Sequence, residues 1–269
     1  MSLLLQISDT HFGTERPAVV DALCRLVEEQ KPQLGVVSGD ITQRARRAQF
    51  DAARRFVDRL ALPLTIAIPG NHDIPLFNPL ARLLWPYANY RRAFGDDLEP
   101  VADTPQWLVI GVKTTRRWRH KDGAVSPGQI ERVVQRLAAA GQRQLRIVAT
   151  HQPLLATRRS DRANVLHGAA DAVRRWAAAG ADLILSGHIH LPFVESFGEH
   201  FADLPRALWA VEAGTAVSAR IREGADNSVN LIRRDDVDVL AHCIVERWDY
   251  APAAQRFERI SASRLRIDR

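Results

Sequence analysis

Five short apolar runs in this sequence each end in side chains that can bind a metal, and this arrangement constrains the fold more than any other feature. Each run is five or six residues long and almost continuously apolar, which is typical of a strand buried on both faces of a sheet. Ligands bind at the carboxyl ends of strands in open α/β sheets, so we expect these side chains to converge there. The runs are 3–8, 34–38, 64–69, 145–150 and 182–186, and the side chains that follow them are Asp9, His11, Asp40, Asn71, His151, His188 and His190.

Helical patterns separate these runs and indicate an α/β fold. The stretch Pro17–Gln30 is apolar on one face, and its proline suits the first turn of a helix. A further strand is predicted over 107–112. Further helices are predicted over 43–60, 130–140 and 167–179, the second of them behind a capping-box sequence.

The pattern changes after Gly187 to strands joined by loops alone. These strands are predicted over 208–211, 228–233, 239–248 and 255–260. A second sheet packed on the first, with helices outside both, accommodates them in one domain over residues 1–269. The proline-rich residues 74–100 are interpreted as an excursion between strands of that domain.

The composition is that of an ordinary globular protein, with 269 residues of which 46% are hydrophobic and 25% charged. The two cysteines, Cys24 and Cys243, are too few for a disulfide framework, so we expect reduced thiols. The N-terminus lacks the pattern of a signal peptide, and no apolar stretch approaches the ~20 residues that a membrane span requires. These features favour a cytoplasmic location and exclude a secreted mini-protein, a membrane-spanning protein and a fibrous protein.

The net charge of +6 comes mainly from arginine, because only three of the 37 basic residues are lysines. The arginines form short groups along the chain, such as 44–47, 116–119 and 158–162, and are not gathered on one element among stacking aromatic residues. This distribution argues against nucleic acid as a partner. Arg158 or Arg159 could bind a substrate phosphate in bidentate fashion, although a solvated loop is the simpler interpretation.

The seven donors combine imidazole nitrogen with carboxylate and amide oxygen, a set that suits Mn, Fe, Zn or Co better than Ca or Mg. Seven donors are too many for one structural site, and a cysteine-type structural zinc is excluded because no cysteine is among them. Two metals about 3.5–4 Å apart that share one carboxylate would use all seven. Alternation along an extended segment would point Asp9 and His11 to one side, and likewise His188 and His190. Four other histidines are interpreted as surface or structural residues: His120, His167, His200 and His242.

The motifs as a set resemble the five-block signature of the calcineurin-like metallophosphoesterases, over residues 3–215. The blocks in this sequence are Asp9-x-His11, Gly39-Asp40, Gly70-Asn71-His72-Asp73, His151 and Gly187-His188-x-His190. Within that superfamily the chain is most similar to the bacterial class III cyclic nucleotide phosphodiesterase group, in the segments Gly39–Gln43, Gly70–Pro75 and Ala213–Asn230. The resemblance implies a four-layer α/β/β/α sandwich of two mixed sheets flanked by helices, with a dinuclear metal centre.

The resemblance also implies a role for each block. It supports His72 as the group that protonates the leaving oxygen, with Asp73 orienting its ring. Many relatives carry a second histidine where this chain has Gln152, so we expect the shell around the metal ligands to differ here. One metal would be held by Asp9, His11, Asp40 and His190, and the other by Asp40, Asn71, His151 and His188, with Asp40 bridging.

These features predict a metal-dependent phosphodiesterase that hydrolyses cyclic nucleotides or similar small phosphodiesters. Two divalent ions, Mn and/or Fe before Zn or Co, would neutralise the phosphoryl oxygens and activate a bridging hydroxide for attack on phosphorus. The alternatives are a nuclease, a nucleotide-lipid pyrophosphatase with an apolar cap at Ile74–Trp85, and a phosphomonoesterase. A non-catalytic scaffold is disfavoured because every ligand is present. Similar enzymes are often dimers, so a homodimer is a further expectation.

Overall fold

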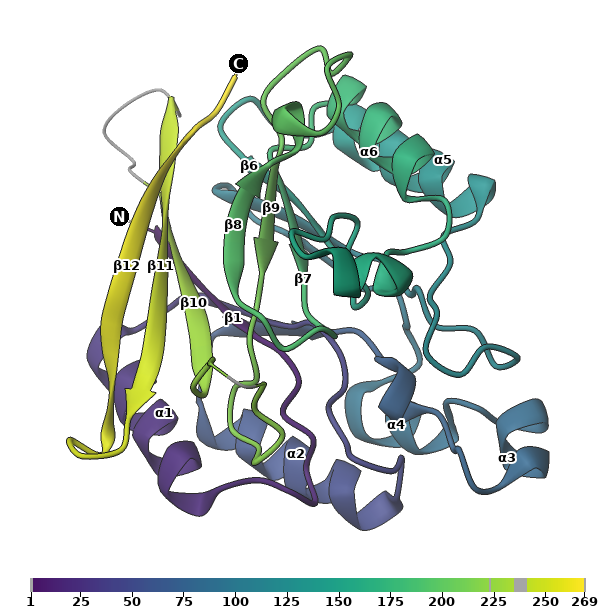
Figure 1. The fold of residues 1–269 in the computed structure, drawn as a ribbon, viewed down its shortest axis with the longest axis vertical. Helices are drawn as coiled ribbons and strands as arrows, with labels where there is room; N and C mark the ends of the chain where they lie inside the picture. The colour runs from purple at the N-terminus through teal and green to yellow at the C-terminus, as the bar shows by residue number, and fades with distance from the viewer. Residues whose placement is uncertain (1, 223, 235–240, 269) are drawn as a thin grey trace.

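The computed structural model describes residues 2–222, 224–234 and 241–268, and in these residues twelve strands form two mixed sheets (Figure 1). The first sheet has the order β12-β11-β10-β1-β2-β3, and the second has the order β4-β5-β6-β7-β9-β8. The strands are β1 Ser2–Ile7, β2 Leu34–Val37, β3 Leu64–Ala67, β4 Val101–Asp103, β5 Trp107–Gly111, β6 Leu145–Ala149, β7 Leu183–Ser186, β8 Phe193–Ser196, β9 Trp209–Glu212, β10 Ser228–Arg234, β11 His242–Ala251 and β12 Arg256–Arg266.

Helices cover the outer face of each sheet, which confirms the four-layer α/β/β/α sandwich (Figure 1). Helices α1 and α2 pack on the first sheet through an apolar cluster that includes Leu23 and Phe50. Helices α5 and α6 pack on the second sheet through a cluster that includes Val148 and Trp176. A third apolar cluster joins the inner faces of the two sheets. The helices are α1 Pro17–Gln30, α2 Arg47–Arg59, α3 Pro79–Leu84, α4 Ala88–Phe94, α5 Pro127–Ala138 and α6 Ala169–Ala178.

Parallel pairing aligns the strands that precede the predicted donors. β1, β2 and β3 are parallel neighbours in the first sheet, with Leu5 opposite Gly35 and Gly35 opposite Thr65. β5, β6, β7 and β9 are parallel neighbours in the second sheet. All five predicted runs are strands whose ends differ from the prediction by at most two residues. The loops that carry the donors therefore leave each sheet at the same edge.

Some elements differ from the sequence prediction. The helix predicted from residue 43 begins at Arg47, because Ala45 has a left-handed backbone (φ 52°) and donates its N–H to Thr42 Oγ1. β12 continues to Arg266, well beyond the predicted end at 260, because it pairs with β11 over that whole length. The short edge strands β4 and β8 have no counterpart in the prediction. The first two residues of the strand predicted over 239–248 lie outside the described residues.

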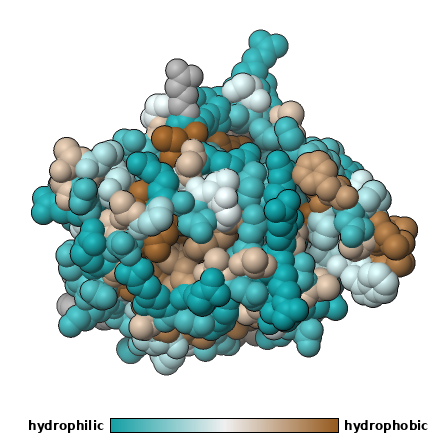
Figure 2. Space-filling view, turned by 90° about the horizontal axis from the view of Figure 1, so that it is seen from below, coloured by the Kyte–Doolittle hydropathy of each residue, from teal (hydrophilic) through white to brown (hydrophobic). Residues whose placement is uncertain are grey.

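The excursion predicted over 74–100 contains α3 and α4, and it leaves a hydrophobic surface exposed. Arg82 Nε donates to Arg117 O (2.7 Å) and Arg117 Nη1 donates to Leu83 O (2.9 Å), which ties α3 to the loop that carries Trp118. Brown side chains project at the right-hand edge of Figure 2, where α3 lies. No helix in the described ranges has the length and apolar character needed to cross a membrane. The α3 patch, as we call this surface, consists of Phe77, Leu80, Leu83, Leu84, Trp85 and Trp118, each 50% to 77% exposed.

Candidate metal centre

The seven predicted donors lie in the loops that follow β1, β2, β3, β6 and β7, and the loops of the two sheets contact each other. His188 N donates to Asp9 Oδ2 (2.9 Å), and His151 Nδ1 donates to Ser38 O (2.9 Å). Each loop of the second sheet is thereby tied to a loop of the first. The approach is close enough to require glycine, since a Cβ atom at Gly70 would overlap the backbone of the loop after β2.

Five of the donors have a left-handed backbone. Side chains with a Cβ atom seldom adopt this conformation, which costs about 1–3 kcal/mol per residue and persists where the surroundings impose it. The idea that strand alternation points the paired donors to one side is therefore wrong, because the chain has already left the extended conformation. The φ angles are 53° at Asp9, 41° at His11, 47° at Asp40, 73° at His188 and 56° at His190.

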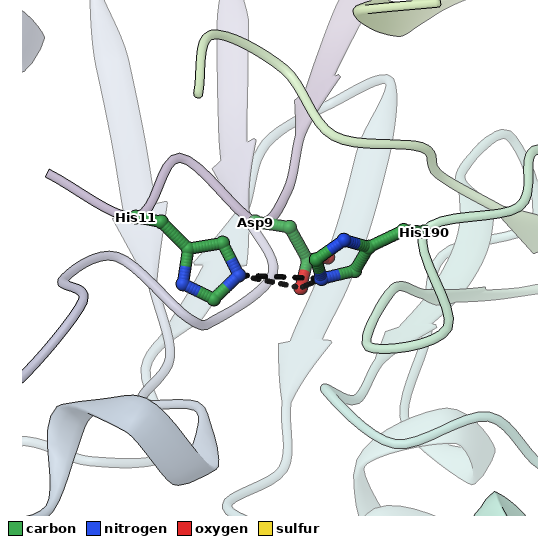
Figure 3. A group of neighbouring side chains, drawn as sticks. All are labelled: Asp9, His11 and His190. Carbon is green, nitrogen blue, oxygen red and sulfur yellow. Dashed lines mark hydrogen bonds and ion pairs between the residues drawn. The ribbon is translucent and has the colours of Figure 1, made fainter. Parts of the chain in front are cut away.

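Asp9, His11 and His190 form a first group of donors (Figure 3). Asp9 Oδ1 lies 3.1 Å from His190 Nε2 and 3.7 Å from His11 Nε2, and these two nitrogens are 3.2 Å apart. The other oxygen, Asp9 Oδ2, accepts hydrogen bonds from Ser8 Oγ (2.7 Å) and from His188 N (2.9 Å). Asp9 Oδ1 is buried and makes no well-oriented hydrogen bond with any described residue. It therefore faces the imidazole nitrogens with its lone pairs unused.

Asp40, His151 and His188 form a second group, whose candidate ligand atoms lie within 4.8 Å of one another. His151 Nε2 is 3.2 Å from Asp40 Oδ1 and 3.3 Å from Asn71 Oδ1. The second oxygen of this carboxylate, Asp40 Oδ2, lies 3.8 Å from His11 Nε2 in the first group. Asp40 thus faces both groups at once, which is the position that a bridging ligand requires.

Hydrogen bonds outside the two groups fix the rings of His151 and His190, one in each group. His190 Nδ1 donates to Arg220 O (2.6 Å), as His151 Nδ1 does to Ser38 O, so Nε2 of each ring remains available for coordination. A buried carboxylate oxygen without a donor, beside two imidazole nitrogens 3.2 Å apart, is costly unless a cation lies between them. In the second group the buried Nδ1 of His188 likewise has no hydrogen-bond partner among the described residues, so the donor set fits divalent metal ions in both groups.

Burial and mutual charge shift the titration of these side chains strongly. Burial alone would lower the pKa of His151, but the charge of Asp40 and the hydrogen bond to it raise that pKa to about 10. Burial lowers the pKa of His11 to about 3. Burial would raise the pKa of Asp40, but the imidazole charges around it hold this pKa well below its usual range. A metal bound by His151 displaces a proton, so metal uptake competes with protonation.

His72 lies beside the first group, with its ring centroid 4.8 Å from that of His11. Its Nδ1 donates to Gln43 O (2.9 Å), and its backbone N donates to Asp40 Oδ1 (2.7 Å). The prediction that Asp73 orients this ring is wrong, because the 3-10 turn over 71–73 directs the Asp73 carboxylate into the backbone of two loops. That carboxylate accepts hydrogen bonds from Gly70 N (2.8 Å), Ile41 N (3.0 Å) and Thr42 N (2.8 Å).

Arg220 is a side chain of this site that the sequence does not single out. Its Nη1 lies 3.1 Å from His72 Nε2 and 3.1 Å from Gln43 Oε1. It belongs to the segment that resembles the phosphodiesterase group, but no local pattern separates it from the many other arginines. Arg158 and Arg159, the arginines considered from the sequence, are both exposed, in agreement with a solvated loop.

Gln152, at the position where the resemblance leads us to expect a second histidine, is fully buried and anchors a loop. Its Nε2 donates to Lys121 O (3.0 Å), and its Oε1 accepts from Thr114 Oγ1. The same loop is held from the other side by Arg116, which donates to Gln129 Oε1 (2.5 Å). These bonds fix the segment that carries Trp118 of the α3 patch.

The four-layer fold and the cluster of overlapping candidate metal-ligand groups at its strand ends agree with a comparison against protein families. The family model described as calcineurin-like phosphoesterase matches residues 3–192, and the chain belongs to this family. Over 205 residues the chain is 26% identical to a probable cyclic nucleotide phosphodiesterase of Synechococcus sp., covering 72% of this chain and 76% of that protein. Over 82 residues it is 35% identical to a glycerophosphodiester phosphodiesterase of Enterobacter lignolyticus, covering 26% and 29% respectively. A dimetal phosphatase from Danio rerio shares the fold, with a TM-score of 0.65 over 99% of both chains at 13% identity.

Proposed function

We propose that the protein is a metal-dependent phosphodiesterase that acts on cyclic nucleotides or similar small phosphodiesters. The observation that carries this proposal is the position of Asp40, which faces His151 through one oxygen and His11 through the other. Two divalent ions bound to these groups supply charge neutralisation at the phosphoryl oxygens and an activated water. The names of the two curated relatives support a diester substrate, and the Danio rerio phosphatase makes a monoester the main alternative.

In this proposal His72 supplies the proton that the leaving oxygen needs, and Asp73 holds the loops that carry two of the donors. Because His72 Nδ1 is bonded to Gln43 O, the ring exchanges protons through Nε2, the atom that we assign to the leaving oxygen. The carboxylate of Asp73 binds backbone N–H groups on either side of the centre, so we assign it to positioning the loops that carry Asp40 and Asn71.

The test is a rate comparison on Mn²⁺-loaded protein with bis(4-nitrophenyl) phosphate and 4-nitrophenyl phosphate, each at equal concentration. We expect the diester to react at least about tenfold faster, and Asp40→Ala to abolish turnover of both. A preference for the monoester would overturn the diester proposal in favour of a phosphatase. Turnover retained in Asp40→Ala would overturn the assignment of the centre itself.

The α3 patch favours a second candidate, hydrolysis of an amphiphilic phosphoester such as a nucleotide-linked lipid. The patch begins close to the centre, because the guanidinium of Arg44 lies 5.0 Å from the ring of Phe77 and the preceding residue, Gln43, contacts His72. This candidate predicts faster hydrolysis of a 4-nitrophenyl phosphodiester with a long alkyl chain than of one with a methyl group. Leu83→Glu should remove that preference and leave the methyl ester unaffected; equal rates with both esters exclude this candidate.

A further inference from the structure

Arg220 carries a charge that the described part of the protein leaves without a carboxylate partner. Arg220 is half-buried, and its Nη1 contacts Gln43 Oε1 (3.1 Å) and His72 Nε2 (3.1 Å), neither of which belongs to a carboxylate. Two residues further along, Arg222 donates to Asp161 Oδ2 (3.0 Å) and to Ile189 O (3.1 Å). One arginine of the pair is therefore neutralised by an acid, whereas the other presents its charge at the donor cluster.

The backbone of Arg220 is fixed to the first donor group. Its carbonyl oxygen accepts hydrogen bonds from His190 Nδ1 (2.6 Å) and from Thr215 Oγ1 (2.9 Å), and its N–H donates to Ser218 Oγ (3.3 Å). From this anchor the side chain extends to the opposite loop, where Gln43 and His72 lie. The guanidinium thus spans the space beside the Asp9, His11 and His190 group.

The contact with His72 places the guanidinium of Arg220 against the imidazole ring. Arg220 Nη1 lies 3.1 Å from His72 Nε2 and 3.5 Å from His72 Nδ1, so it lies over the face of the ring and not in line with one nitrogen. While this contact persists, the guanidinium covers that face of the ring. A ligand with a stronger acceptor than imidazole would draw the guanidinium away and uncover the ring.

We propose that Arg220 is the substrate-binding cation of this site, and that its guanidinium moves from the His72 ring to a non-bridging oxygen of a bound phosphoryl group. The exchange uncovers the ring, and Nε2 of His72 takes up a proton from solvent before it can protonate the leaving oxygen. The guanidinium fork matches phosphoryl oxygens and forms charge-assisted hydrogen bonds with them, which a neutral imidazole cannot match. The inference rests on the proposed function in one respect, the phosphoester character of the ligand.

The first measurement is binding of inorganic phosphate to Mn²⁺-loaded protein by titration calorimetry, with metal content determined for every variant. We expect Arg220→Ala to weaken phosphate binding by about 10- to 100-fold and Arg220→Lys to weaken it less, with metal content unchanged. Arg44→Ala is the matched control, because Arg44 is an exposed cation that follows Gln43 and stacks on Phe77. It should change phosphate binding by less than about twofold.

The second measurement separates a binding role from a structural one. In Arg220→Ala the KM for bis(4-nitrophenyl) phosphate should rise, and guanidinium ion at millimolar concentration should restore part of the lost phosphate affinity. Equal phosphate affinity in Arg220→Ala and the wild type would overturn the proposal, and so would loss of bound metal in that variant. Wild-type protein that binds phosphate through Arg220 but does not hydrolyse the diester would instead overturn the proposed function and leave the assignment of Arg220 in place.

Discussion

The two sheets contribute unlike donors to the candidate metal centre. The loops of the first sheet supply all the oxygen donors, Asp9, Asp40 and Asn71, together with a single histidine. The loops of the second sheet supply histidines only, His151, His188 and His190. Because carboxylates bring negative charge and coordinating imidazoles are neutral, the attraction for cations resides on one sheet and the other completes the coordination. A metal bound here would join the two layers as well as act on a substrate.

The largest expected effect comes from removing the oxygen donor that faces both groups. Asp40→Ala should lower bound metal from about two ions per chain to less than one and reduce turnover by at least about 10³-fold. His188→Ala, which removes a donor of the second sheet and of one group only, should retain one ion. The measurement is the metal content of each variant, determined by mass spectrometry after dialysis against Mn²⁺. An equal loss of bound metal in the two variants would show that the two sheets do not differ in their contribution to metal binding.

The next effect concerns His72, which lies on the first sheet's side within reach of His11 and Asp40, and which we assign to proton transfer and not to metal binding. His72→Ala should keep both metal ions and slow hydrolysis of a diester with an alkyl leaving group by about 10²–10⁴-fold. A nitrophenyl leaving group needs no proton, so the loss with that diester should be much smaller. A loss of the same size with both leaving groups would show that His72 acts by positioning and not by proton donation.

Metal removal should weaken the packing between the sheets. Ligand at about 100 times its Kd stabilises a folded protein by about 2.7 kcal/mol, which corresponds to a rise of about 5–10 °C in the melting temperature of a chain of this size. Chelated protein should therefore melt that much lower, and Mn²⁺ should restore the difference. Asp40→Ala serves as control, since its melting temperature should not respond to the chelator. A wild-type melting temperature that is insensitive to chelation would mean that the metal does not join the layers.

The strand ends of the centre could be predicted from sequence because the evidence for them is local. An apolar run followed, directly or after one glycine, by aspartate, asparagine or histidine places the donor whatever the rest of the chain does. The backbone at the donors could not be predicted, because the φ angles depend on loops of the opposite sheet that press against them. Arg220 was missed for the same reason, since its partner Gln43 lies 177 residues away in the sequence.

The extent of β12 shows a different limit. Most of its residues are exposed, so the sequence offers no continuous apolar run and no regular alternation from which the end could be predicted. Its length is set by pairing with β11, from Ala251 opposite Arg256 to His242 opposite Arg266. A strand defined by its partner is accessible to sequence analysis only once the partner is known.

The smallest effect concerns a buried carboxyl of the second sheet that belongs to neither donor group. Glu212, at the end of β9, is buried and accepts a hydrogen bond from Ser186 Oγ, and burial raises its pKa well above its usual range. The unfolded chain ionises this group near its ordinary pKa of 4.5, whereas the folded protein holds the proton to a higher pH because its pKa is raised. The folded state therefore binds more protons above that pH, and the free energy of unfolding falls as pH rises.

Glu212→Gln removes this dependence while preserving shape. Urea unfolding at several pH values should show the variant close to the wild type near pH 4.5 and increasingly more stable than it as the pH rises above that value. Glu29→Gln, at an exposed position of α1, is the control and should show no such trend. A difference between variant and wild type that stays constant with pH would mean that Glu212 is ionised when folded. In that case the second sheet would also present a negative charge near the centre, and the contrast between the two sheets would fail.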